Sequence, residues 1–469
     1  MASNLVVFGL IALTLHFLLS ISWTHIAIRA QSKRRGCSPP PILPHNDWLG
    51  LLRFRSLLKA RREKRALAWM VETMDLAGQN VDTAQDKMLG HSFIWTRDVE
   101  NARALFGAQA ADFDIDSDAR RIALPMIGSG IFNTTGEIWK ESRAMLRPHF
   151  TRTQVSTLTL EEKHFQRMLA NISEKAGNWT VDFDIQPLIS NFTLDIATEF
   201  LFGTSADSQA SFAQKSIPKD DFQLNWDGAA KYFEIRAILR RYCWLYQPRK
   251  FRQHCHAIHA FADKNVDAAL ARRRTKQSQK PIQKKSFVML DEVVEMTTNR
   301  YRLRAECLNV LGASRTSTAG LIQWTFYFLA RHPLTYQKLR TVILERFGNY
   351  GSADNITYEK LKNCKYLHCC INEVFRIAPV IPIQTRRAVR DTTLPKGGGL
   401  GGKNPIFLPK GTEVRQVFYA MCMRKDIWGK DVAVFRPERF EDRVMSSEWM
   451  PFGAGPRVCI GRKCYPSSI

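Results

Sequence analysis

The hydrophobic pattern begins with an uncharged stretch at the N-terminus. Residues 5–28 contain no Asp, Glu, Lys or Arg, and a run of this length can cross a bilayer as a helix. Basic residues follow at once, at Arg29, Lys33, Arg34 and Arg35. The positive-inside rule then places the remaining chain in the cytosol. We expect a membrane anchor over residues 1–28. The alternative is a cleaved signal peptide, but a signal peptide typically has a basic segment before its apolar run and a shorter apolar run than this one.

A proline-rich segment separates the expected anchor from the rest of the chain. Residues 38–44 read SPPPILP, a composition that favours a stiff, extended backbone. Residues 29–46 are therefore predicted to be a basic, proline-rich linker. From Asp47 onward the apolar residues follow mostly helical spacing, with no second linker. We expect one large domain over residues 47–469.

Strand patterns within this domain are few and short. Runs of β-branched and aromatic residues at 93–96, 383–389 and 406–408 predict strands. A long apolar helical pattern covers residues 308–324, and polar residues at 313–318 interrupt it. Clustered hydroxyls in a helix can bond to carbonyls one turn earlier and bend it. The predicted fold class is mainly α with small peripheral β-sheets.

Charge and cysteine content narrow the possible partners. The formal net charge is +24, from 68 Lys and Arg against 44 Asp and Glu, which indicates an acidic partner protein or an anionic membrane surface. Zinc-finger spacing and RNA-recognition signatures are absent from the sequence, so we expect no nucleic-acid partner. The ten cysteines form no regular framework, and we interpret them as mostly reduced thiols.

The strongest chemical signal lies at residues 451–462, which read PFGAGPRVCIGR. Glycines allow the backbone to approach a bulky group closely, and Arg457 stands two residues before Cys459, where it could meet an anion. A helix that starts after Cys459 would favour the thiolate, which is a ligand for a soft or redox-active metal. The alternative is a turn that contains a buried free cysteine.

This stretch resembles the haem-binding loop of the cytochrome P-450 family, F-G-x-G-x-R-x-C-x-G. Its fixed positions are filled by Phe452, Gly453, Gly455, Arg457, Cys459 and Gly461. The resemblance implies the cytochrome P-450 fold with haem b (iron protoporphyrin IX) as cofactor. It assigns Cys459 as the iron ligand, and it assigns cofactor contacts to Phe452, Gly453, Arg457 and Gly461.

Further cofactor contacts are implied by two earlier segments. Trp139 and Arg143 are four residues apart and share one helix face. Their indole N–H and guanidinium can bind a carboxylate, although such pairs often only pack. In the family that this chain resembles, the same pair meets a haem propionate. A further propionate partner is implied at Arg386 or Arg387, and alignment with the family favours Arg386.

The helix that passes over the haem in this family carries the pattern small-Gly-x-Asp/Glu-Thr. Here Ser314, Thr316 and Ser317 replace the Gly, the acid and the Thr. The resemblance gives Ser317 the role of positioning a water in the proton relay, with Thr316 as a helper. The missing acid puts the usual relay in question. The alternative is a polar patch on a buried helix.

A third family motif is structural. Glu373 and Arg376 stand at i and i+3 on one predicted helix, a spacing that is also common in weak surface pairs. In the family that this chain resembles, the Glu and Arg of Glu-x-x-Arg form an internal ion pair. A later Arg joins them as the third member. The corresponding residue here is Arg439. We expect a buried triad that stabilises the fold around the haem loop.

Finer matches, such as those at residues 113–115, 125–132 and 329–333, are similar to the fungal branch that hydroxylates n-alkanes and fatty acids. They imply a monooxygenase that inserts one oxygen atom of O2 into an apolar small-molecule substrate, such as a long-chain alkane, fatty acid or similar lipid. Electrons would come from NADPH through a separate NADPH-cytochrome reductase. A single N-terminal anchor in membrane lipid would hold the cytosolic domain at the endoplasmic reticulum.

The end of the sequence departs from the family pattern. Only residues 460–469 follow Cys459, and they include Pro466, which limits a helix there. The family continues with a long helix and a hairpin. The resemblance therefore implies a fold that lacks these elements and holds haem weakly. The alternative function is a truncated, catalytically inactive member that at most binds haem or lipid.

Overall fold

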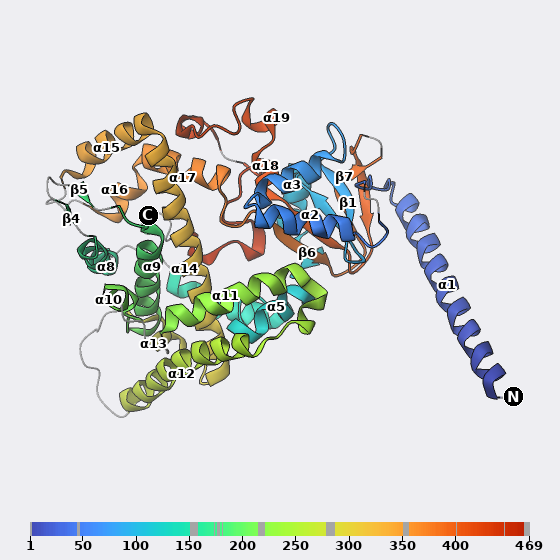
Figure 1. Cartoon of the computed structure of the whole chain (residues 1–469), viewed down its shortest axis with the longest axis horizontal. Coiled ribbons are helices and arrows are strands. Elements are labelled where there is room, and N and C mark those ends of the chain that lie inside the picture. The colour runs from blue at the N-terminus through green and yellow to red at the C-terminus, as the bar shows by residue number, and fades with distance from the viewer. Residues whose placement is uncertain are drawn as a thin grey trace. The chain divides into compact units, whose positions relative to one another are not determined.

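The computed structural model describes residues 2–44, 47–150, 158–172, 174–175, 179–180, 182–213, 221–277, 287–349, 356–399, 401–444 and 446–463. The chain forms two compact units (Figure 1). Unit 1 comprises Met1–Asp114, Ile381–Ala433 and Met445–Val458, and unit 2 comprises Ile115–Val380, Val434–Val444 and Cys459–Ile469.

Unit 1 contains all but two of the short strands described. Its helical elements are α1 (Ala2–Arg34), α2 (Leu51–Arg62), α3 (Ala66–Asp75), α4 (Val99–Arg103), η1 (Ala104–Ala108), η2 (Ala110–Asp112), α18 (Phe418–Cys422), α19 (Lys425–Trp428) and η7 (Gly455–Arg457). Its strands are β1 (Thr83–Met88), β2 (His91–Thr96), β3 (Phe113–Asp114), β6 (Gln384–Ala388), β7 (Thr392–Gly398), β8 (Asn404–Leu408) and β9 (Glu413–Gln416).

The strands of unit 1 form two sheets. The larger sheet has the order β1-β2-β9-β6-β3, and a separate pair joins β7 to β8. The β2–β9 pair is parallel, with Ile94 opposite Val414, while β6 pairs antiparallel with both β9 and β3. The predicted strands at 93–96, 383–389 and 406–408 are confirmed as β2, β6 and β8.

Strand β1 was not expected from the sequence because it reads TAQDKM. Asp86 is fully buried there, and a lone buried carboxylate is costly. Two neighbours stabilise it: Trp95 Nε1 donates a hydrogen bond at 3.1 Å, and Arg53 Nε lies 3.4 Å away. Tertiary partners therefore allow an acidic residue in the strand, and local composition does not reveal them.

The proline-rich segment at 38–44 is extended, as expected, and it is bound along unit 1, whereas the start of the predicted linker, residues 29–34, continues helix α1. Leu43 N donates to Gln85 O at 2.9 Å, and Gln85 N donates to Pro41 O at 2.8 Å. Leu43 is fully buried in a hydrophobic cluster with Trp69 and Trp95. This segment therefore acts as an additional edge of the β-sheet region as well as a connector.

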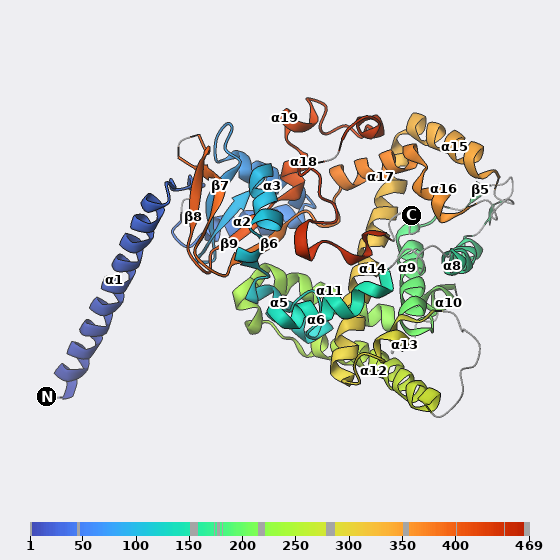
Figure 2. The same cartoon turned by 180° about the vertical axis from the view of Figure 1, so that it is seen from behind.

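Unit 2 is mostly helical (Figure 2). Its helical elements are α5 (Ser117–Ile127), α6 (Gly136–Leu146), η3 (Arg147–Phe150), α8 (Thr159–Ala170), α9 (Ile185–Phe202), α10 (Ser208–Ala213), α11 (Phe222–Leu239), η4 (Arg240–Leu245), α12 (Arg249–Gln277), α13 (Met289–Val293), α14 (Arg300–Arg331), α15 (Pro333–Phe347), α16 (Tyr358–Lys362), α17 (Lys365–Ile377), η6 (Pro437–Phe440) and η8 (Ile460–Lys463). The strands β4 (Glu174–Lys175) and β5 (Trp179–Thr180) form a small pair.

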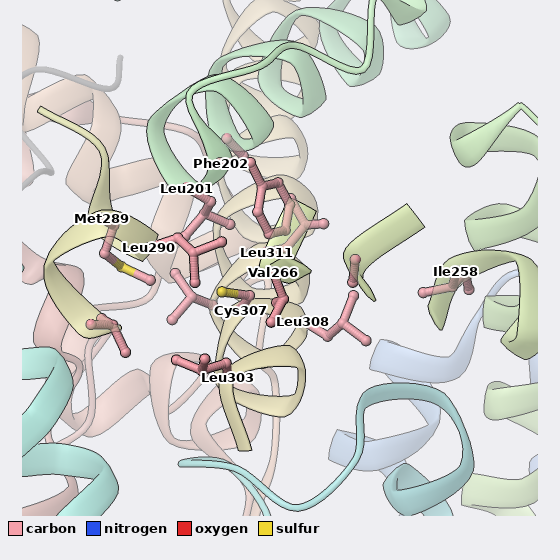
Figure 3. Close-up of a cluster of buried hydrophobic side chains, with 14 of the residues drawn as sticks. Leu201, Phe202, Ile258, Val266, Met289, Leu290, Leu303, Cys307, Leu308 and Leu311 are labelled. Atoms are coloured by element: carbon pink, nitrogen blue, oxygen red, sulfur yellow. The ribbon is translucent and has the colours of Figure 1, made fainter. Parts of the chain in front are cut away.

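Helix α14 is the centre of unit 2 and packs against α9, α12 and α17. Its Leu303, Cys307, Leu308 and Leu311 are buried in one cluster with side chains of α9, α12 and α13, as Figure 3 shows. A four-residue spacing keeps such positions on one helical face. This cluster is the main hydrophobic core of unit 2.

The polar stretch at 313–318 does not interrupt α14, contrary to the sequence expectation, because helix runs from Arg300 to Arg331. The hydroxyls bond back along the helix as expected: Ser317 Oγ donates to Ala313 O and Ser314 Oγ donates to Leu311 O at 3.2 Å. Each hydroxyl thus finds an acceptor in the preceding turn of the same helix. The backbone of α14 stays helical through the segment.

The predicted ion-pair triad is confirmed within unit 2. Arg376 Nε and Nη2 each lie 2.7 Å from a Glu373 carboxylate oxygen, and Arg439 Nε lies 3.5 Å from Glu373 Oε1. The backbone N–H of Arg436 also donates to Glu373, at 3.0 Å. Glu373 and Arg376 are fully buried. The triad thus joins α17 to the segment around η6.

The expected membrane anchor coincides with helix α1, but the side chains at 2–14, 17, 18 and 21 lie outside the described part. Among the helices that could be assessed in the described residues, none is both long and apolar enough to cross a membrane. The expectation about the chain end concerns residues 464–469, which lie outside the described residues.

Candidate haem-binding site

Cys459 stands directly before the short 3-10 helix η8 in unit 2. The next residue, Ile460, packs against the main core of that unit, and so does Trp139 of α6. Cys459 is exposed, whereas the other eight cysteines within the described residues are buried or half-buried. Cys459 is therefore the one exposed cysteine residue in the described part of the chain, and it lies on a turn that the core anchors.

The pKa of the Cys459 thiol is raised, because the atoms packed around the sulfur exclude water even though part of the residue is exposed. The backbone amides of Gly461 and Arg462 and the charge of Arg143 act in the opposite direction. A helix does start after the cysteine, as expected, but the expected net lowering is wrong for the haem-free chain. Four residues of 3-10 helix align few peptide dipoles, so burial dominates.

Trp139 and Arg143 share one face of α6, as predicted. The guanidinium of Arg143 lies over the Trp139 ring, 5.7 Å from its centroid. Burial lowers the pKa of Arg143, and the nearby cation Arg147 adds to this effect, whereas Cys459 opposes it. This part of unit 2 therefore combines the exposed residue Cys459 with a partly buried cation.

The two candidate relay residues on α14 have different environments. Ser317 is half-buried and donates its hydroxyl proton to Ala313 O, while Thr316 is exposed. The Ser317 oxygen retains lone pairs with which it can accept a hydrogen bond from water. Thr316 has no acidic group of its own to supply a proton. The pair can therefore orient a water, but it offers no proton donor comparable to a carboxylic acid.

In unit 1, the cofactor candidate on strand β6 is Arg386. Its guanidinium stacks over the Phe106 ring at 4.9 Å. Burial lowers its pKa to about 10, the charge of Arg457 adds to this effect, and Asp114 opposes it. The neighbouring Arg387 points along the opposite face of the strand, where its Nη2 lies 3.6 Å from Glu413. Arg386 is therefore the better placed of the two to meet an added anion.

The unit 1 part of the cysteine loop is fixed by close contacts. Arg457 Nη2 donates to Asp114 Oδ1 at 2.6 Å. Gly455 has φ +65°, and a Cβ at this position would lie only 1.7 Å from Phe106 O, so no larger residue fits there. Gly453, at φ +70°, also uses a conformation that favours glycine. Phe452 is half-buried beside it.

These residues fit a cofactor that combines iron with two carboxylates, as haem does. In unit 2, Cys459 offers a thiol for a metal, and burial lowers the pKa of the Arg143 guanidinium. In unit 1, taken by itself, burial lowers the pKa of the Arg386 guanidinium. Burying a cation is costly unless an anion offsets its charge. The donor set is therefore chemically suited to haem.

Two neighbours of these residues were missed at the sequence level. Phe106 supports Arg386 and touches Gly455, and Asp114 pairs with Arg457. Phe106 lies in the π-helix η1, an element that is rare and often near functional sites. The sequence carried no signal for η1, because its Phe106 meets Arg386 and Gly455, which are distant in the chain.

Comparison with known proteins identifies the family of the chain. The Cytochrome P-450 family model matches residues 73–464. Cytochrome P-450 monooxygenase g430 from Fusarium sp is 37% identical over 445 residues, 92% of this chain and 77% of the relative. Cytochrome P-450 52A12 from Debaryomyces hansenii is 36% identical over 454 residues, 94% of this chain and 85% of the relative. Cytochrome P-450 52A5 from Candida maltosa is 36% identical over 446 residues, 92% and 83% respectively.

The matched range covers most of both units, and the mostly helical fold with small sheets agrees with the family. Members of this family use haem b, whose iron is held by a cysteine thiolate, and they receive electrons from NAD(P)H indirectly through a reductase. The chain belongs to the cytochrome P-450 family of monooxygenases.

Proposed function

We propose that this protein inserts one oxygen atom of O2 into a long-chain alkane, fatty acid or similar lipid. The observation that carries the proposal is the exposed residue Cys459 on its core-anchored turn, in a chain with 36% identity to two 52A cytochromes. The resemblance of residues 113–115, 125–132 and 329–333 to the fungal branch that hydroxylates n-alkanes and fatty acids supports the substrate class.

In this proposal Cys459 ligates the iron, and Trp139, Arg143, Arg386 and Arg457 bind the propionates. Phe452, Gly453 and Gly461 shape the backbone around the cofactor. The bound haem would supply the oxidation, favoured by electron donation from the thiolate. The protein binds and orients the two reactants and excludes water from them.

Ser317 holds the water of the proton relay in this proposal, and Thr316 assists it. Ser317 already donates its proton to Ala313 O, so its oxygen is left to accept from that water. With no carboxylic acid in the motif, protons must reach the water from solvent, and the exposed side of Thr316 is a route for them. We expect turnover to be limited at this step.

We further propose that residues 1–28 anchor the chain in the endoplasmic reticulum membrane, residues 29–46 link it to the domain, and residues 47–469 form the cytosolic catalytic domain. The net charge of +24 supports both an acidic NADPH-cytochrome reductase and anionic membrane lipid as partners.

The test is a reconstituted reaction with purified full-length protein, reductase, NADPH and isotopically labelled O2. A long-chain alkane or fatty acid should gain one labelled oxygen atom, as measured by mass spectrometry. A short polar alcohol of similar concentration is the negative control. If no lipid substrate gains label while the reductase still reduces the haem, the alternative of a catalytically inactive haem- or lipid-binding member holds; the missing acid beside Ser317 favours that alternative.

A further inference from the structure

The connection between α5 and α6 is tied to helix α14 by two buried side chains. Glu306 Oε2 accepts a hydrogen bond from Ile131 N at 3.1 Å, and Asn309 Oδ1 accepts one from Phe132 N at 3.1 Å. Glu306 is fully buried and Asn309 is 1% exposed. The two residues are three apart and lie on one face of the helix. Successive backbone amides of the connection therefore depend on α14.

Asn309 also binds the other side of the same turn. Its Nδ2 donates to Ile127 O, the last residue of α5, at 3.0 Å, and to Ala305 O at 2.7 Å. An amide side chain can accept and donate at once, so Asn309 holds the end of α5 and the amide of Phe132 together. An apolar residue of similar size would leave these buried groups unsatisfied.

The backbone of the connection lies directly on α14. Gly128 has φ +70°, and a Cβ there would stand 2.9 Å from Ala305 Cβ. At Gly130 a Cβ would stand 2.6 Å from Asn309 Nδ2. Since real Cβ atoms do not approach other atoms so closely, both positions require glycine, and the hydrogen bonds depend on this close packing.

The connection leads straight into helix α6. Asn133 Oδ1 accepts from Gly130 N at 2.9 Å, and Thr134 Oγ1 donates to Gly130 O at 2.8 Å. Helix α6 begins two residues later at Gly136. Its buried Ser142 lies near enough to Glu306 to lower the pKa of that carboxyl, although burial raises it overall. Glu306 therefore adjoins both the connection and the helix that follows it.

We propose that Glu306 and Asn309 are positioning residues for haem binding: from α14 they fix the connection at 128–135 and thereby the helix that carries Trp139 and Arg143. Helix α6 has only 11 residues, so the placement of its first turn sets where both side chains lie. The inference rests on the proposed propionate contacts, but the fixing of the connection itself does not.

The first measurement is amide hydrogen exchange of residues 127–135 in the haem-free full-length chain. Glu306→Ala and Asn309→Ala should each speed exchange of the Ile131 and Phe132 amides by about tenfold or more, since each loses a buried acceptor. Glu306→Gln keeps an oxygen for the Ile131 amide and should restore most of the protection.

The second measurement is haem transfer from the loaded full-length protein to excess apomyoglobin. Glu306→Ala and Asn309→Ala should release haem about tenfold faster than the unaltered chain, and Glu306→Gln at nearly the original rate. The matched control is Asp195→Ala, which removes a buried acceptor of the Ser208 and Gln209 amides on α10. It should lower stability without changing haem release.

The two readouts separate the possible failures. Unchanged exchange at Ile131 and Phe132 would overturn the fixing of the connection. Faster exchange with unchanged haem release, or haem release equal to that of Asp195→Ala, would overturn the positioning role. If no variant or parent chain binds haem at all, the proposed function fails while the exchange result still stands.

Discussion

At the residue scale, the cations of the site differ in what balances them. Arg457 is paired with Asp114 at 2.6 Å and Arg387 with Glu413 at 3.6 Å. Arg386 instead stacks on Phe106 and donates hydrogen bonds to Thr385 O at 3.0 Å and to Gln384 Oε1 at 3.4 Å, and burial lowers its pKa to about 10. A half-buried cation that meets neutral acceptors lowers stability, and an anion that binds beside it offsets this cost. Arg386 therefore lowers the stability of the folded chain while it is placed to bind an anionic ligand.

The substitution Arg386→Gln should separate these two effects. Because burial holds the pKa of Arg386 lower in the folded chain than in the unfolded one, the charged form disfavours folding at neutral pH. This cost begins to fall only as the pH rises above about 10, and it is lost above the pKa of the unfolded chain. We expect the free energy of unfolding of the haem-free variant to rise by on the order of 1 kcal/mol, as measured by denaturant unfolding. The haem-loaded variant should release haem faster than the unaltered chain.

The control for this substitution is Arg387→Gln on the same strand. It removes the ion pair with Glu413 and should lower stability at neutral pH without changing haem release. Equal effects of the two substitutions on unfolding and on haem release would contradict the distinction drawn between them.

Thr316 tests the proton relay at the same scale. Placing a carboxylate there with Thr316→Asp restores the acid of the family motif. General acid–base steps typically contribute about 10²–10⁴-fold, so the ratio of product to NADPH consumed should rise and peroxide release should fall. Thr318→Asp, two residues further along α14, is the matched control and should not improve the ratio. An unchanged ratio in Thr316→Asp would mean that protons arrive by another route.

At the element scale, residue patterns predicted those elements whose side chains are typical of their structure. The runs at 93–96, 383–389 and 406–408 became β2, β6 and β8. Strand β1 was missed because its buried Asp86 is stabilised by Arg53 and Trp95, which lie on other elements. The site followed the same rule: the cysteine loop was evident from local spacing, whereas the roles of Phe106 and Asn309 arise from tertiary contacts.

The triad that joins α17 to η6 gives the prediction for this scale. Glu373→Ala would leave Arg376 and Arg439 charged and buried without their shared carboxylate. Breaking a buried ion pair costs roughly 3–5 kcal/mol, and we expect that loss in denaturant unfolding of the full chain. Glu137→Ala, which removes an exposed pair with Lys140, should cost less than about 1 kcal/mol. A loss below 1 kcal/mol for Glu373→Ala would contradict the role of the triad.

At the scale of the whole molecule, membrane topology can be measured directly. The motif Asn-x-Ser/Thr occurs at Asn133, Asn171, Asn178, Asn191 and Asn355. Glycans are added to surface positions of secreted or lumenal proteins. Asn133 and Asn191 are buried in the folded chain. For a cytosolic domain we expect all five to stay unmodified in a eukaryotic host. A glycosidase-sensitive decrease in mass would place the domain on the lumenal side instead.

The proposed iron ligand of the whole chain is the Cys459 thiolate. The measurement is the carbon monoxide difference spectrum of reduced, purified full-length protein, compared with Cys459→Ala and with Cys37→Ala as the control cysteine. The parent chain and Cys37→Ala should give the red-shifted Soret band of a thiolate-ligated haem, and Cys459→Ala should lose it. A shifted band that persists in Cys459→Ala would contradict the assignment.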